Sequence, residues 1–103
     1  MFLVQILLPL YDNDGRALVR DLYDGVFRVL TERFGGVTAF TRSPAEGAWK
    51  EPGGSEVNRD RVVIFEVMVE RLDHDWWGAF RRQLEADFKQ EKIVIRATAA
   101  EEL

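Results

Sequence analysis

The stretch VVIFEVMV, residues 62–69, decides the fold of this chain. It is apolar and rich in β-branched side chains, and Glu66 is its one charged residue. A short, continuous apolar run of this kind is typical of a strand that is covered on both faces. A second run, FLVQILL at residues 2–8, ends at Pro9 and the turn-forming segment 11–15. The two runs predict the central strands of one sheet.

Two segments between and after these runs have helical periodicity. In residues 16–34 we expect a helix whose first turn is capped by Asn13 or Asp14 and whose end is set by Gly35-Gly36. Its apolar positions recur every three or four residues: Leu18, Leu22, Val26, Val29 and Leu30. A second helix is expected to begin after Asp73 as its N-cap, with one apolar face made of Trp77, Phe80, Leu84 and Phe88.

Two further strands, at residues 37–42 and 92–98, are more polar than the first two. The element order is therefore strand, helix, strand, strand, helix, strand. Two right-handed crossovers put the apolar strands in the centre, which gives the sheet order 4-1-3-2 with both helices on one face. Residues 43–60 hold two of the three prolines and are too many for a simple loop, so we expect an extended loop or a β-hairpin arm. We expect residues 1–103 to form a single α+β domain.

This βαββαβ order resembles the ferredoxin-like fold. A sheet that is apolar on both faces is similar to that of the dimeric α+β-barrel proteins, a group that includes cofactor-free monooxygenases, muconolactone-isomerase-like enzymes and non-enzymatic ligand binders. The stretch FGGVTAF at 34–40, with GAW at 47–49, also resembles stretches in small bacterial proteins of unknown function. These resemblances imply a fold and carry over no catalytic residue, because fold alone does not establish function.

Strand alternation assigns the side chains to two faces of the sheet. One set should meet the helices: Phe2, Val4, Ile6, Leu8, Val63, Phe65, Val67, Val69, Ile93 and Ile95. The opposite set should form a second apolar surface: Leu3, Leu7, Val62, Ile64, Met68 and Val94. An uncovered patch of several hundred Å² is near the upper limit for soluble monomers. We therefore expect a homo-oligomer, a dimer or higher, that forms through this sheet face, or an arm that folds back over it.

Three polar side chains, Gln5, Glu66 and Arg96, share that second face. They could line a ligand pocket in which a desolvated Glu66 acts as a general base. The interpretation that we favour is a structural Glu66–Arg96 ion pair in an oligomer interface, since buried charges need partners. The candidate ligand-binding or interface residues are these three together with Trp49, Ile64 and Met68.

Other kinds of site have weaker support. His74 lies between Asp73 and Asp75, but first-turn aspartates are explained by the helix dipole alone. With one histidine and no cysteine the usual zinc ligand sets are missing, and we expect neither a metal nor a cofactor. The formal net charge of −4 and the absence of a basic run disfavour nucleic-acid binding. The apolar start lacks the features of a signal peptide and is too short for a membrane-spanning helix, so we expect a cytoplasmic protein without a membrane partner.

Three functional hypotheses follow. The first is a non-enzymatic homo-oligomer that binds a small molecule or a protein through the sheet face and the arm. The second is a small cofactor-independent enzyme, monooxygenase- or isomerase-like, that uses Glu66, Arg96, Trp49 or His74. The third is a structural or regulatory assembly module.

Overall fold

The computed structural model contains four strands and two helices in the expected order. They are β1 (Phe2–Pro9), α1 (Arg20–Phe34), β2 (Thr38–Lys50), β3 (Val57–Val69), α2 (His74–Asp87) and β4 (Val94–Ala99). The structure describes residues 1–50 and 57–103, with side chains for 1–40 and 61–103.

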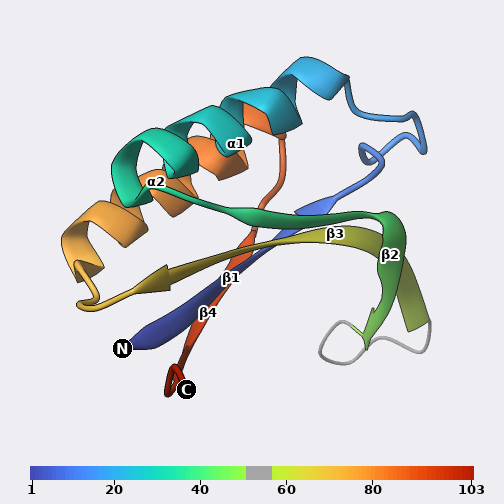
Figure 1. Cartoon of the computed structure of the whole chain (residues 1–103). Helices are drawn as coiled ribbons and strands as arrows, with labels where there is room; N and C mark the ends of the chain where they lie inside the picture. Colours follow the sequence, from blue (N-terminus) through green and yellow to red (C-terminus); the bar gives the residue numbers. More distant parts are fainter. Residues whose placement is uncertain (51–56) are drawn as a thin grey trace.

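The strands form one antiparallel sheet in the order β2-β3-β1-β4. Both helices pack on the same face, and the other face is left open (Figure 1). This confirms the α+β, ferredoxin-like βαββαβ architecture, including the sheet order 4-1-3-2. The right-handed hand of both crossovers is the physical reason that the two helices share a face.

The hydrophobic core lies between the sheet and the helices. Central strands β1 and β3 supply most of its sheet side, with Val4, Ile6 and Leu8 facing the helices beside Phe65 and Val67. From the helices and the loop before β4 it receives Val26, Leu30, Trp77, Leu84, Phe88 and Ile93. The predicted division of the sheet residues between two faces is confirmed, although Phe2 and Ile95 are only partly buried.

The start of α1 differs from the prediction. The helix begins at Arg20 with Val19 as its N-cap, and neither Asn13 nor Asp14 caps it. Instead Asp12 Oδ1 accepts hydrogen bonds of 2.9 Å from the amides of Asp14 and Arg16. These bonds hold residues 12–16 in a turn of their own, and a bridge between Tyr11 and Ala17 closes it. The polar side chains that favoured a helix start are therefore used inside the loop.

The start of α2 agrees with the prediction. Asp73 is the N-cap, and its Oδ1 accepts a hydrogen bond of 3.0 Å from the amide of Trp76. The same carboxylate lies 3.6 Å from Arg33 of α1. Phe34, at the end of α1, stacks on Trp77 with 5.2 Å between ring centres. Aromatic and charged contacts thus join the last turn of α1 to the first turn of α2.

Strands β2 and β3 remain paired with each other beyond the four-stranded part of the sheet. Ala45 pairs with Val62 and Lys50 with Val57, after an irregularity between Phe40 and Ala45. The expected hairpin arm is therefore a continuation of β2 and β3. Residues 51–56 of the expected arm lie outside the described residues.

Candidate functional site

The open face of the sheet is organised in rows that cross the strands. One row is polar and contains a residue from every strand: Thr38 pairs with Glu66, Glu66 with Gln5, and Gln5 with Arg96. Paired residues of antiparallel strands point to the same face, so these four side chains share the open surface. The predicted grouping of Gln5, Glu66 and Arg96 on one face is what the register produces.

Gln5 connects the two charged side chains of this row. Its Nε2 donates a hydrogen bond of 2.6 Å to Glu66 Oε1, and Arg96 Nε donates one of 2.8 Å to Gln5 Oε1. Among the described side chains, Glu66 and Arg96 form no direct ion pair. An amide between them uses both of its hydrogen-bonding ends and sets the orientation of the carboxylate, which is half-buried.

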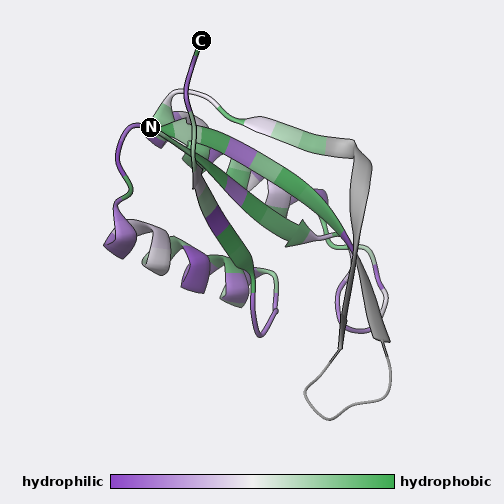
Figure 2. Ribbon diagram, turned by 90° about the horizontal axis from the view of Figure 1, so that it is seen from below, coloured by the Kyte–Doolittle hydropathy of each residue, from purple (hydrophilic) through white to green (hydrophobic). Residues whose placement is uncertain are grey.

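Apolar rows lie on both sides of the polar row. On one side Met68 pairs with Leu3, and on the other Phe40, Ile64, Leu7 and Val94 follow one another across the four strands. Met68 is 42%, Val94 41% and Phe40 47% exposed. Figure 2 shows this face as hydrophobic strands crossed by hydrophilic segments. The open surface is therefore apolar with a charged band through it, as expected of an interface or a ligand site.

A hollow of about 420 Å³ adjoins Glu66 where β2 leaves the turn after α1. Gly35 ends the helix in the left-handed conformation, with φ 79°, and a Cβ atom added to Gly36 would meet no atom within 4 Å. The two glycines line the hollow and add no side chain to it. Its lining residues are Leu3, Phe34, Gly35, Gly36, Val37, Thr38, Glu66, Val67 and Met68.

The remaining predicted residues are placed as follows. Ile64 is half-buried in the apolar row beside Leu7, and Arg96 is exposed at the β4 end of the polar row, outside the lining of the hollow. The side chain of Trp49 lies outside the described residues. His74 is exposed at the first residue of α2, away from the open face. The hollow therefore combines Glu66 and Met68 of the predicted set with Thr38 and the Gly35-Gly36 pair.

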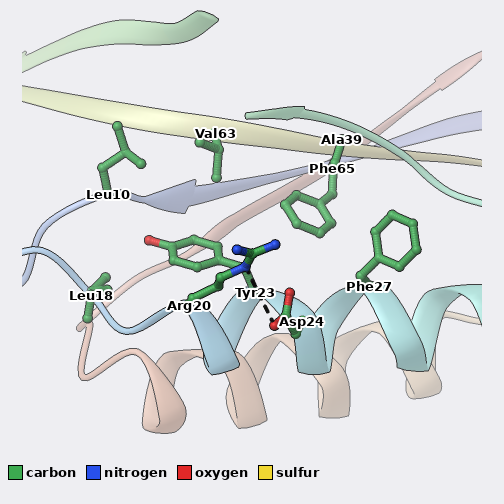
Figure 3. A pocket seen from close by; sticks show the side chains of 9 residues that line it. All are labelled: Leu10, Leu18, Arg20, Tyr23, Asp24, Phe27, Ala39, Val63 and Phe65. Carbon is green, nitrogen blue, oxygen red and sulfur yellow. Dashed lines mark ion pairs between the residues drawn. The ribbon is translucent and has the colours of Figure 1, made fainter. Parts of the chain in front are cut away.

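A second hollow, of about 540 Å³, was not anticipated from the sequence. It lies on the helix side of the sheet, between α1 and the β2–β3 edge, with Phe65 and Val63 among the residues at its floor (Figure 3). Tyr23 contributes a half-buried ring and donates a hydrogen bond from its hydroxyl to the carbonyl oxygen of Pro9. Burial raises the pKa of the Tyr23 hydroxyl above 10.0. Phe27, on the next turn of α1, is 47% exposed at this hollow.

Among the described side chains, those of residues 1–40 and 61–103, there is no group of three or more His, Cys, Asp or Glu placed to hold a metal ion. Neither helix in the described part of the chain has the length and apolar character needed to cross a bilayer.

Comparisons with known proteins found similar solved structures. No protein-family model matches the chain, and no curated protein matches it. Among solved structures it is similar to a phage SAM lyase in complex with S-methyl-5'-thioadenosine, with a TM-score of 0.63 and 17% identity over 94% of this chain and 79% of that one. A phage SAM lyase in the apo state gives a TM-score of 0.57 and 16% identity, over 94% and 78% of the two chains.

At these identities the likeness concerns the fold. It extends over nearly the whole chain, so that the arrangement of four strands and two helices described above is shared with the phage SAM lyase structures.

Proposed function

We propose that this protein is a homo-oligomer that binds a small molecule in the hollow beside Glu66, and that the ligand is an S-adenosyl compound such as S-adenosylmethionine or S-methyl-5'-thioadenosine. The observation that carries the proposal is the Glu66 carboxylate, which lines the hollow and is oriented by Gln5. The ligand class is suggested by the fold neighbour, a lyase that holds S-methyl-5'-thioadenosine.

The chemistry of the hollow suits such a ligand. A carboxylate accepts hydrogen bonds from ribose hydroxyls and attracts the positive charge of a sulfonium. Leu3, Val37 and Met68 offer apolar surface for a purine ring or a thioether. The hollow is within the range of about 300–1,000 Å³ that small-molecule sites occupy.

The homo-oligomer part of the proposal rests on the apolar rows of the open face. Covering exposed apolar surface contributes about 25 cal/mol per Å², before the cost of association. Met68 belongs to both the apolar surface and the hollow, so a second copy seated on this face would lie at the edge of the ligand site. Oligomerisation and ligand binding would then share residues.

Calorimetric titration with each ligand tests the proposal. Glu66→Gln removes the charge and keeps the shape of the side chain, so S-adenosylmethionine should bind about tenfold more weakly, equivalent to about 1.4 kcal/mol. S-Methyl-5'-thioadenosine is neutral and should lose less affinity. Glu70→Gln is the matched control, because Glu70 is exposed just beyond the end of β3 and outside the hollow. Failure of both ligands to bind, or equal losses in the two variants, would refute the proposal.

A second candidate function is cleavage of S-adenosylmethionine, which the lyase activity in the neighbour's name favours. In an elimination, Glu66 would take a proton from the 3-amino-3-carboxypropyl group, at the carbon next to the one bonded to sulfur. The electron pair of that C–H bond would form a C=C bond, and the C–S bond would break with both electrons going to sulfur. The sulfonium would leave as neutral S-methyl-5'-thioadenosine.

Chromatography of S-adenosylmethionine incubated with the protein separates binding from cleavage. Enzymatic cleavage requires S-methyl-5'-thioadenosine to accumulate faster than in a protein-free sample. Glu66→Gln should abolish this excess and still bind the product. Binding without excess product would leave the non-enzymatic function, and excess product that persists in Glu66→Gln would exclude Glu66 as the base.

A further inference from the structure

We propose that the hollow under α1 is a separate site for a free amino acid with an apolar or aromatic side chain. It would take the side chain between α1 and the sheet and bind the α-carboxylate with Arg20 and the α-ammonium with Asp24. The site lies on the face of the sheet opposite Glu66, and its evidence is independent of the function proposed above.

The interior of the hollow is suited to an apolar group. Val63 and Phe65 are almost fully buried at its floor, and Leu10, Leu18 and Ala39 complete the apolar lining. Its volume of about 540 Å³ is in the range of small-molecule sites, about 300–1,000 Å³. Phe27, which is half-exposed at the hollow, would be covered further by a ligand there.

Opposite charges lie together at the rim of the hollow. Arg20 and Asp24 are one helical turn apart on α1, and Figure 3 shows both side chains beside the hollow, joined as an ion pair. The Nε–Oδ2 distance is 3.9 Å, and the side chains are 91% and 64% exposed. Exposed ion pairs of this kind contribute about 0–1 kcal/mol to stability. Each of the two side chains can therefore leave the other and pair with a charge of the ligand at little cost in free energy.

This combination selects a zwitterion. A free amino acid has a carboxylate and an ammonium on one carbon and a side chain that leaves the same carbon. Arg20 offers a planar fork of donors that matches a carboxylate, and Asp24 accepts hydrogen bonds from an ammonium. A simple carboxylic acid would leave Asp24 facing a like charge, and a simple amine would do the same to Arg20.

Tyr23 adds a polar feature inside the hollow. Its hydroxyl proton is directed to the Pro9 carbonyl, which leaves the oxygen as an acceptor for a ligand. A tyrosine hydroxyl is neutral at physiological pH, and burial raises the pKa of this one further, so it does not repel the ligand carboxylate.

Titration with L-phenylalanine and its two half-analogues, followed by calorimetry or ligand-observed NMR, tests the proposal. 3-Phenylpropionate lacks the ammonium group and phenethylamine lacks the carboxylate. L-Phenylalanine should bind with a Kd on the order of 1 mM or below, about tenfold more tightly than either analogue. Arg20→Gln should weaken L-phenylalanine and 3-phenylpropionate, whereas Asp24→Asn should weaken L-phenylalanine and phenethylamine. Ala39→Leu narrows the hollow and should abolish binding.

Two residues of the same helix provide matched controls. Arg28→Gln and Asp21→Asn remove the same kinds of charge from α1, and neither residue lines this hollow. Both controls should bind L-phenylalanine as the wild type does, and circular dichroism checks that every variant is folded. No binding by the wild-type protein up to about 10 mM would overturn the proposal. Binding that Arg20→Gln and Asp24→Asn leave unchanged, or that 3-phenylpropionate matches, would overturn it too.

Discussion

The guanidinium carbon of Arg33 lies 4.4 Å from the centre of the Trp76 ring. The same guanidinium is 3.6 Å from the Asp73 carboxylate. Arg33 is in the last turn of α1, whereas Asp73 and Trp76 begin α2. A single cation therefore contacts both the capping residue and an aromatic ring of the neighbouring helix.

Asp73→Ala should destabilise the protein by about 1 kcal/mol, because it removes the hydrogen bond to the Trp76 amide and the contact with Arg33. Urea unfolding followed by tryptophan fluorescence measures this change. Asp75→Ala is the matched control, since Asp75 lies in the same turn but does not cap the helix. A loss in Asp75→Ala as large as in Asp73→Ala would contradict the role of the cap.

Gln5→Leu should destabilise the protein by about 1–3 kcal/mol, because Glu66 and Arg96 both lose a hydrogen-bond partner on a partly covered surface. The double variant Gln5→Leu/Glu66→Leu should recover part of this loss, since the carboxylate that lacks a partner is gone. Urea midpoints of the wild type and the two variants decide this. A double variant less stable than Gln5→Leu would argue against the hydrogen-bonded row as the cause.

Tyr23→Phe should change how stability depends on alkaline pH. Burial raises the folded-state pKa of Tyr23 above the ordinary value of 10.0, so the folded protein resists ionisation of this group. Its contribution is complete below pH 10.0 and is lost as the pH rises through the folded pKa. The wild type should therefore lose stability above pH 10.0 more steeply than Tyr23→Phe.

Urea midpoints measured on both sides of pH 10.0 give this comparison. Tyr11→Phe is the control, because Tyr11 is exposed and its variant should follow the wild-type curve. Parallel curves for the wild type and Tyr23→Phe would show that the burial of Tyr23 does not affect stability in this range.

Ile64→Lys or Met68→Lys should dissociate the proposed homo-oligomer, because each places a charge in an apolar row of the open face. Light scattering coupled to size exclusion measures the mass. Val19→Lys is the control, since Val19 is an exposed apolar residue before α1 and outside the open face. An unchanged mass in both test variants, or a monomeric wild type, would contradict the sheet-face interface.

The sequence was sufficient for the architecture because two signals agreed. The apolar runs at 2–8 and 62–69 indicated central strands, and the hand of the crossovers then determined the sheet order and the single helical layer. Side-chain alternation predicted which of Leu3, Val4, Ile64 and Phe65 face the core. It also placed Gln5, Glu66 and Arg96 on one face, because a period of two depends only on backbone geometry.

Local details were harder to predict where one residue type serves two purposes. Asp12, Asn13 and Asp14 suit a helix cap and a turn equally, and the turn that Asp12 makes within the loop moved the start of α1 to Arg20. The hydrogen bonds through Gln5 could not be predicted without the strand register, which places Gln5 between Glu66 and Arg96. The hollow under α1 depends on where α1 sits above the sheet, which periodicity does not determine.

The amide of Gln5 has a direction. Its nitrogen end faces Glu66 on β3 and its oxygen end faces Arg96 on β4, so a rotation by 180° would put like partial charges together at both ends. A molecule that took over Glu66 as its own hydrogen-bond partner would remove the reason for this orientation and would weaken the hold on Arg96, two strands away. Binding of a ligand to Glu66 on β3 would then change the contacts of Arg96 on the edge strand β4 through the single side chain of Gln5, without movement of the backbone.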